Sequence, residues 1–194
     1  MVGAGQGNPG ASDVRQPDGD VEALSTITVP ARWASANAND LRSLIRSSDE
    51  VFFGRVTRVL GQRQANQPRG ANSDRQGLPL TSFEITVASA VAGTVSPGAA
   101  VVIDQVGGTV VAPGGTRRYV VLEADQLLEG GAEYLFFADR MPDGNLTVPP
   151  FGRLEVGTDG LLEPLLVWSR LGALQELAGL SSSAAAARVG SLSK

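Results

Sequence analysis

The chain contains neither histidine nor cysteine, and this composition restricts the chemistry that its side chains can perform. Without histidine there is no Ser–His–Asp triad and no imidazole base. Without cysteine there is no thiolate nucleophile, disulfide or thiolate metal site. Serines are plentiful, but no Gly-x-Ser-x-Gly motif accompanies them, and the single lysine is Lys194 at the end of the chain. Carboxylates are the catalytic groups that remain, and we expect no cofactor and no metal site.

Four carboxylates lie on or beside predicted strands, where a sheet could bring two of them together: Glu84, Asp104, Glu123 and Asp125. Glycoside hydrolysis uses a carboxyl pair at separations of roughly 5–9.5 Å. Each of the four alternates with apolar neighbours, a pattern typical of the solvent-facing side of a strand. We therefore expect solvated surface acids, and a carboxylate-dependent polysaccharide hydrolase is the enzymatic alternative.

The other candidate residues are basic or aromatic and would serve binding. They are Arg63, Arg69, Arg75, Arg117, Arg118 and Tyr119. The first three belong to a long polar tract that predicts a loop over 61–78, and the last three form one compact basic–aromatic group. Recognition residues are commonly carried by loops on a rigid scaffold, so we expect a partner to contact this loop or the loops around Gly108 and Gly114. The net charge of −4 and the isoelectric point of about 4.9 argue against general nucleic-acid binding.

Short strands are the elements that must position these residues. Apolar and polar residues alternate over 82–87, which is typical of a strand with one buried face. Further strands are predicted over these ranges: 51–60, 99–106, 119–123, 133–138, 146–148, 153–156 and 161–162, with a lead-in over 27–30. Gly54 predicts a bulge inside its strand. The sequence Met-Pro-Asp-Gly-Asn over 141–145 predicts a hairpin turn, because Asp-Gly and Asn tolerate positive φ.

Two helices flank the strands. The first is predicted over 37–48, where Leu41, Leu44 and Ile45 have helical spacing and Asn37 or Asn39 can cap the start. The second is predicted from the spacing of apolar residues between 167 and 178, with Gly179 ending it. No apolar run is long enough to span a membrane.

The number and spacing of these strands predict a mainly β fold. We expect a small closed or partly open OB-like β-barrel with a short N-terminal helix and a C-terminal helix, and a β-sandwich is the alternative. The predicted organisation is a flexible arm over 1–25, one barrel domain over 26–180 and a tail over 181–194 whose order the sequence leaves open.

Several motifs in this order resemble a group of uncharacterised bacterial secreted proteins. They include Leu-Arg-Ser-Leu-Ile over 41–45, Ser-Asp-Glu-Val-Phe-Phe-Gly-Arg-Val over 48–56, and Phe-Glu-Ile-Thr-Val over 83–87. Leu-Glu-Gly-Gly-Ala-Glu-Tyr-Leu-Phe-Phe over 128–137 and Phe-Gly-Arg-Leu-Glu-Val over 151–156 continue the likeness. Such chains are similar to the OB-like barrel of the netrin and metalloproteinase-inhibitor class. The resemblance covers about 40–163 and implies a fold rather than an activity.

The leading functional hypothesis is a non-enzymatic, exported or surface-associated binding or structural module. The Gly-rich start is typical of a mature terminus after signal-peptide removal, so we expect an extracellular or cell-surface location, with a cytoplasmic one as the alternative. An unidentified protein or surface is the expected partner. A self-assembling subunit that uses its N-terminal arm or a strand is a further alternative.

Overall fold

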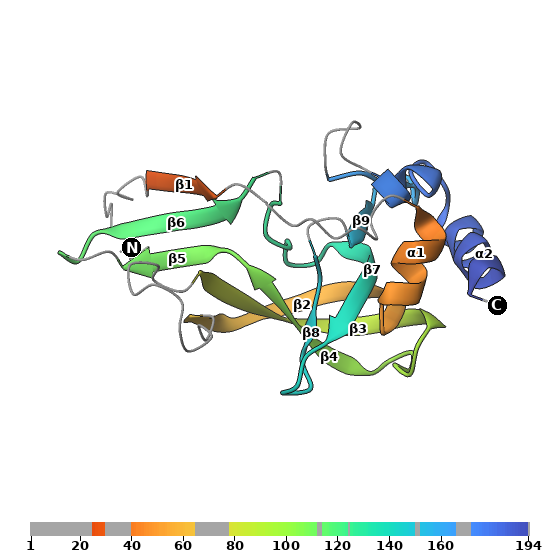
Figure 1. Cartoon of the computed structure of the whole chain (residues 1–194), viewed down its shortest axis with the longest axis horizontal. Coiled ribbons are helices and arrows are strands. Elements are labelled where there is room, and N and C mark those ends of the chain that lie inside the picture. The colour runs from red at the N-terminus through yellow and green to blue at the C-terminus, as the bar shows by residue number, and fades with distance from the viewer. Residues whose placement is uncertain are drawn as a thin grey trace, which may run out of the picture.

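A computed structural model describes residues 25–29, 40–64, 78–111, 114–123, 125–149, 152–165 and 172–193 (Figure 1). The strands are β1 (Ser25–Val29), β2 (Glu50–Gln64), β3 (Pro79–Ala92), β4 (Ala100–Val106), β5 (Gly108–Val111), β6 (Arg117–Leu122), β7 (Glu133–Arg140), β8 (Leu146–Thr147), β9 (Arg153–Val156) and β10 (Leu162–Glu163). The helices are α1 (Leu41–Ser47), the short 3-10 helix η2 (Gly172–Glu176) and α2 (Ser182–Leu192).

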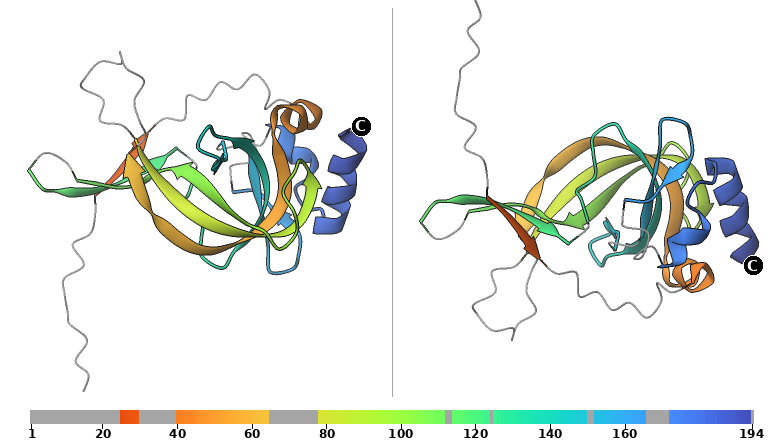
Figure 2. Two further views of the ribbon diagram at one scale, coloured as in Figure 1. Left: turned by 90° about the horizontal axis from the view of Figure 1, so that it is seen from below. Right: turned by 90° about the horizontal axis from the view of Figure 1, so that it is seen from above.

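Five of these strands close into a ring (Figure 2). β2 pairs antiparallel with both β3 and β7, and β3 pairs antiparallel with β4. β8 closes the ring because it pairs parallel with β4 and antiparallel with β7. β9 and β10 extend the sheet beyond β7. The prediction of a mainly β, barrel-like fold with a short N-terminal helix and a C-terminal helix is confirmed.

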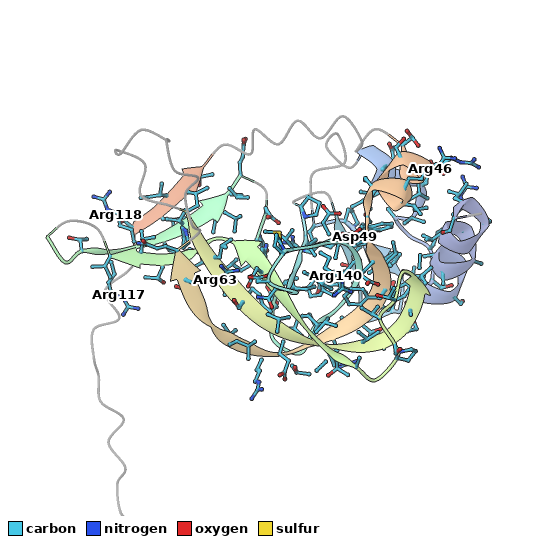
Figure 3. All side chains as sticks on the ribbon, turned by 60° about the horizontal axis from the view of Figure 1, so that its bottom comes forward. Arg46, Asp49, Arg63, Arg117, Arg118 and Arg140 are labelled. Atoms are coloured by element: carbon cyan, nitrogen blue, oxygen red, sulfur yellow. The ribbon has the colours of Figure 1, made fainter. Side chains whose placement is uncertain are left out.

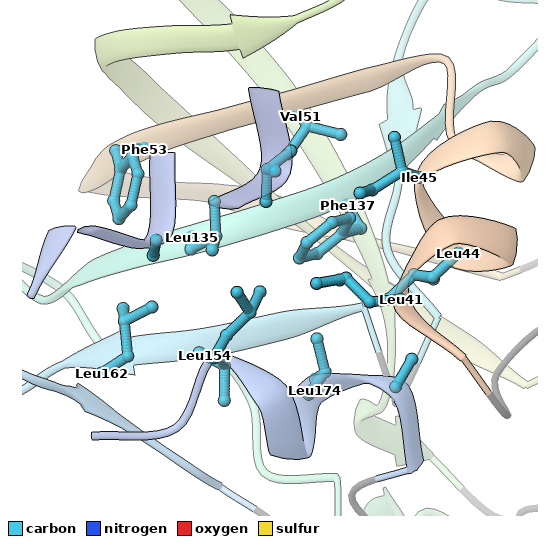
Figure 4. Packing of buried hydrophobic residues seen from close by; sticks show 14 residues of the cluster. Leu41, Leu44, Ile45, Val51, Phe53, Leu135, Phe137, Leu154, Leu162 and Leu174 are labelled. Carbon is cyan, nitrogen blue, oxygen red and sulfur yellow. The ribbon is translucent and has the colours of Figure 1, made fainter. Parts of the chain in front are cut away.

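The walls of this ring are buried on both faces where β2 and β7 pair. Phe52 and Val56 of β2 and Phe136 of β7 pack into the barrel interior. Val51 and Phe53 point the other way, onto a second core that α1, η2 and α2 cover (Figure 4). Because successive strand residues face opposite sides, burial of both faces explains the continuous apolar runs in these two strands.

A second sheet, in the order β1-β6-β5, extends from one end of the barrel (Figure 1). The chain leaves the barrel sheet at Gly107 and enters this sheet at Gly108; both glycines have positive φ, 131° and 130°. A Cβ at Gly108 would lie 2.6 Å from Nε2 of Gln62 and 2.7 Å from Oγ1 of Thr81. The expectation of a loop around Gly108 is therefore wrong, since Gly108 begins a strand.

The helix boundaries differ from those predicted. α1 begins after Asp40, whose carboxylate accepts a hydrogen bond from Ser43 N at 2.8 Å, so neither Asn37 nor Asn39 is the cap. The C-terminal helix lies in the tail over 181–194, where Ser181 caps α2. The segment over 172–178 forms only η2 and a turn, and 166–171 lies outside the described residues. Of the expected arm over 1–25, residues 1–24 are also outside them, and Ser25 is the first residue of β1.

Other local predictions are confirmed. The β2–β3 register shifts between Phe53 and Gly54, as expected for a bulge. The 141–145 turn joins β7 to β8 and is closed by Met141 N donating to Asn145 O at 2.8 Å. Within the residues described, no helix has the length and apolarity needed to cross a membrane.

Candidate functional site

Arg63, one of the predicted binding residues, lies near the end of β2 at the centre of a polar network. Its guanidinium forms an ion pair with Asp104 of β4 and a second one with Asp143 of the β7–β8 turn at 3.2 Å. Asp104 also accepts hydrogen bonds from Ser82 Oγ and from Asn145 Nδ2, the latter at 3.1 Å. Two strands, β2 and β3, and one hairpin turn thus contribute side chains to the carboxylate of Asp104 on β4.

The Asp104 carboxylate is buried, with its side chain only 3% exposed, while that of Arg63 is 40% exposed. Burial alone raises the pKa of Asp104, but the hydrogen bonds from Ser82, Arg63 and Asn145 outweigh it and hold the pKa below its ordinary value. The acid is therefore ionised at neutral pH and fixes the position of Arg63 at the surface.

An open hollow of about 390 Å³ lies beside this network, and we call it the Arg63 depression. It is lined by Leu60, Gly61, Gln62, Arg63, Ser82, Val102 and Asn145. Gly61 contributes to the hollow because it has no side chain, and an added Cβ there would have nothing within 4 Å. Four consecutive residues of β2 therefore form one wall, and the outer faces of β3 and β4 form another.

Arg117, Arg118 and Tyr119, the other predicted binding residues that the structure describes, do not line this depression; Figure 3 shows Arg117 and Arg118 apart from Arg63. Arg117 and Arg118 lie on β6 in the small sheet and are exposed. Tyr119 is half-buried, and desolvation raises its pKa. Because adjacent strand residues point to opposite faces, Arg118 faces away from Arg117 and Tyr119, so the compact basic–aromatic group is divided. Arg69 and Arg75 lie outside the described residues.

A second buried carboxylate, Glu50 at the start of β2, was not singled out from the sequence. It is 1% exposed and accepts hydrogen bonds from Thr94 N at 2.7 Å, Thr94 Oγ1 at 2.6 Å and Val95 N at 3.1 Å. Arg140 of β7 adds an ion pair. We call these residues the Glu50 cluster. Burial alone raises the pKa of Glu50, but the hydrogen bonds from these donors lower it by more, so the pKa lies below its ordinary value.

The Glu50 cluster borders an open hollow of about 450 Å³ that Asp49, Arg140, Met141 and Pro142 help to line. Figure 3 shows Asp49 beside Arg140, whose backbone N donates to Asp49 Oδ2 at 2.7 Å. Desolvation, together with the nearby Asp49, raises the pKa of Asp139. The sequence signal that could have indicated this cluster is an acid directly before a strand that is buried on both faces.

A third buried acid, Asp125, forms an ion pair with Arg153 at 2.6 Å, and both side chains are 2% exposed. Gln105 Nε2 donates to Asp125 Oδ1 and to Gln126 O, while Leu128 N donates to Gln105 Oε1. This network fixes the 125–128 segment against β4. Buried ionic groups of this kind need hydrogen-bonding partners. The Asp125 carboxylate contacts the side chains of Arg153 and Gln105, and Arg153 Nη2 also donates to Gln126 O. Within the described residues, Nε and Nη1 of Arg153 are buried without a hydrogen-bond partner.

The expectation that all four candidate carboxylates are solvated is wrong for Asp104 and Asp125, which are buried and paired with arginine. Glu84 is partly exposed and pairs with Arg58 at 2.8 Å; the hydrogen bond from Arg58 lowers its pKa. Glu123 is exposed at the end of β6. The burial of Asp104 could not be predicted from the alternation of residues along β4. It depends on the β7–β8 turn, which is distant in the sequence and covers this carboxylate.

Comparison with known proteins found no relative: no protein-family model matches the chain, and no curated protein matches it.

Proposed function

We propose that this chain is a non-enzymatic, exported or surface-associated binding module whose contact surface is the projecting end of the barrel. The projecting end is defined as Thr57–Gln64 of β2 together with the Arg63 depression. One observation carries the proposal: every residue from Thr57 to Gln64 is exposed, although the strand is held in place by its pairing with β3. A rigid strand that presents both faces and one edge to solvent is suited to recognition.

The strand order of the ring supports the proposed OB-like resemblance. The order β2-β3-β4-β8-β7, with a parallel contact between β4 and β8, corresponds to a five-stranded OB-type barrel. In such barrels the ligand face lies over the second and third strands, between the first and the last interstrand loops. The equivalent face here is the outer side of β3 and β4, where Ser82 and Val102 line the Arg63 depression. Export is proposed from the motif resemblance.

Three of the four carboxylates considered for a hydrolase, Asp104, Glu84 and Asp125, support the non-enzymatic hypothesis. A general acid for glycoside cleavage needs a raised pKa and access to the substrate. Asp104 and Glu84 instead have lowered pKa values, because Ser82 and Arg63 donate to the first and Arg58 to the second. Asp125 is buried against Arg153. None of these three side chains has the properties of a proton donor to a bound sugar.

The test uses the immobilised full chain exposed to extracts and surface fractions of its source. A specific partner should be captured by the wild-type chain, lost with Leu60→Asp at the projecting end, and retained with Arg188→Glu on α2. Equal capture by all three chains would contradict the assignment of the surface. Release of reducing sugar from a polysaccharide panel, abolished by Asp104→Asn, would replace the binding function with the hydrolase.

A further inference from the structure

β2 has two strand neighbours over only its first part. Residues Glu50–Arg55 pair with β7, and the last contacts on that side are made by Val56, whose N donates to Ala132 O at 2.9 Å and whose O accepts from Gly131 N at 2.8 Å. From Thr57 to Gln64, the described residues provide β2 with a partner on the β3 side alone. Among the described residues, no strand pairs with the opposite edge of Thr57–Gln64, and we refer to this side as the free edge of β2.

We propose that this edge accepts an extended, acidic segment of a partner protein as an added strand. The inference rests on the proposed binding function and specifies the chemistry of the partner. An edge strand presents unpaired backbone N–H and C=O groups, which form a template for another chain. Strand addition of this kind obtains affinity from main-chain hydrogen bonds and specificity from pockets for alternate side chains.

The side chains along the edge match that mode of binding. Val59 is 56% exposed and Leu60 is 44% exposed, so the edge offers apolar contacts as well as backbone groups. The Arg63 depression borders the strand at Leu60 and Gly61, but it opens toward β3 and β4, where Ser82 and Val102 line it. Because Val59 and Leu60 are adjacent and face opposite sides of the strand, alternate residues of an extended segment would contact one or the other of them.

The charge of the edge argues for an acidic partner. Residues 51–64 contain three arginines and no acid, and residues 51–77 carry a net charge of +4 in a chain of net −4. Directly opposite side chains in a strand pair lie about 4.5–5.5 Å apart, and opposite charges there are stabilising. Arg58 already pairs with Glu84 on the β3 side, but it remains 66% exposed and keeps further N–H donors for a second acid.

The same composition argues against a second copy of β2 as the occupant. Because residues 51–64 hold no acid, no register of a β2–β2 pairing brings opposite charges together, and some registers place arginine against arginine. Like charges directly opposite are destabilising. The shifts in β2–β3 register after Val56 and Val59 also disturb a regular self-pairing. The arginines therefore discourage self-association and remain complementary to an acidic strand.

The first experiment selects random linear twelve-residue peptides, displayed on phage, against the immobilised full chain. The expected result is enrichment of peptides in which acidic and apolar residues alternate. Arg58→Glu should weaken the best synthetic peptide by roughly fivefold to tenfold, from the loss of one attraction and the gain of one repulsion. Arg188→Glu is the matched control, since Arg188 also pairs with a single glutamate, Glu176, on the surface. Unchanged melting temperatures show that both variants are folded.

The second experiment separates strand addition from side-chain docking. Amide hydrogen exchange is measured on the full chain with and without the selected peptide, and new protection is expected within 57–64. A peptide N-methylated at alternate positions should lose binding in one of its two methylation patterns. Peptide binding that requires Arg63 but gives no new protection within 57–64 would overturn strand addition while leaving the binding module intact.

Two other outcomes also decide the matter. Selected peptides without acidic residues would overturn the charge assignment. A synthetic peptide of residues 11–24, which contains Asp13, Asp18, Asp20 and Glu22, is the self-derived probe. If it binds as tightly as the selected peptides and the chain self-associates in sedimentation, a neighbouring copy is the occupant and the foreign partner is excluded. Failure of peptide selection together with failure of partner capture would remove both the inference and the proposed function.

Discussion

The Glu50 cluster and the network around Asp104 share a plan, in which a half-exposed arginine covers a buried carboxylate. The side chain of Arg140 is 44% exposed above Glu50, and that of Arg63 is 40% exposed above Asp104. The two regions differ in the donors that the carboxylate receives. Glu50 binds the backbone N–H groups of Thr94 and Val95, which belong to the β3–β4 connection. Asp104 receives its hydrogen bonds from the side chains of Ser82, Arg63 and Asn145.

This difference assigns a role to each region. A carboxylate that binds backbone groups determines the path of the chain, so its loss leaves buried main-chain donors unsatisfied. A carboxylate that binds side chains positions those side chains, while the backbone hydrogen bonds between the strands do not depend on it. The Glu50 cluster is accordingly expected to contribute mainly to stability, and the Asp104 network mainly to the surface that Arg63 presents.

The largest effect is expected from Glu50→Ala. The change removes the acceptor of four hydrogen bonds, two of them from backbone N–H groups. We expect the free energy of unfolding to fall by about 3 kcal/mol, measured by urea denaturation at pH 7. Glu176→Ala removes an exposed ion pair and should cost less than about 0.5 kcal/mol. Equal losses for the two variants would mean that the backbone contacts of Glu50 contribute nothing.

Two glycine substitutions test the same contrast. At Gly93, with φ of 100°, a Cβ would lie 2.1 Å from Glu50 Oε2 and 2.6 Å from Asp49 O. Gly93→Ala therefore combines backbone strain with a clash against the Glu50 carboxylate and the main-chain oxygen of Asp49, and it should cost about 2–3 kcal/mol. At Gly61, with φ of 150°, nothing lies within 4 Å of the added Cβ, so Gly61→Ala should cost about 1 kcal/mol from strain alone. Thermal unfolding of both variants gives the comparison, and a larger loss for Gly61→Ala would contradict it.

The pH dependence of Asp104→Asn gives a smaller effect. The pKa of Asp104 is lowered in the folded chain, since the donors around it outweigh its burial. Its contribution is therefore present above the pKa of the unfolded chain and is lost as the pH falls through the folded pKa. Asp104→Asn should cost about 1–2 kcal/mol at pH 7 and progressively less below about pH 4. Urea denaturation of wild type and variant at pH 7 and below about pH 4 measures the loss of stability. A loss that is independent of pH would show that the charge of Asp104 is not involved.

The smallest effect is a gain in stability from Asp139→Asn. Desolvation, helped by Asp49, raises the pKa of Asp139. A raised pKa means that the contribution of this acid is present below its unfolded pKa and is lost as the pH rises through the folded value. Replacing Asp139 by a neutral amide should therefore stabilise the chain at pH 7 by less than about 1 kcal/mol. Asp143→Asn, which removes one ion pair from Arg63, should not stabilise the chain, and urea midpoints distinguish the two.

Most strands could be predicted because each has a local signature. Phe83, Ile85 and Val87 alternate with polar residues and form the buried face of β3. β5 was not predicted because a Gly-Gly pair such as Gly107-Gly108 is also typical of a turn. The structure shows that glycine is needed at 108 because Gln62 and Thr81 leave no room for a side chain there. α2 was missed because its Ser/Ala-rich sequence has few large apolar residues; its buried side chains are Ala185 and Val189.

The candidate site was harder to predict than the fold. Arg63 could be identified from its place in a polar, arginine-containing tract, but the loop predicted over 61–78 is wrong for 61–64, because β2 continues to Gln64. The partners of Arg63 could not be identified, because Asp104 is 41 residues away along the chain and is buried by a turn from another hairpin. Glu50 resembles any acid at the start of a strand, and its burial depends on the β3–β4 connection more than 40 residues later. Long-range burial of this kind leaves no local pattern in the sequence.

The parallel pairing of β1 with β6 has a consequence for the order of folding. Thr26 is registered with Tyr119, about ninety residues later in the chain. At synthesis rates of roughly 5–20 residues per second, β1 leaves the ribosome several seconds before its partner exists. Of its residues 25–28, whose burial is described, none belongs to either core and three are exposed. Docking of β1 is therefore a late event that awaits a completed barrel, and it lengthens the average contact separation that slows folding.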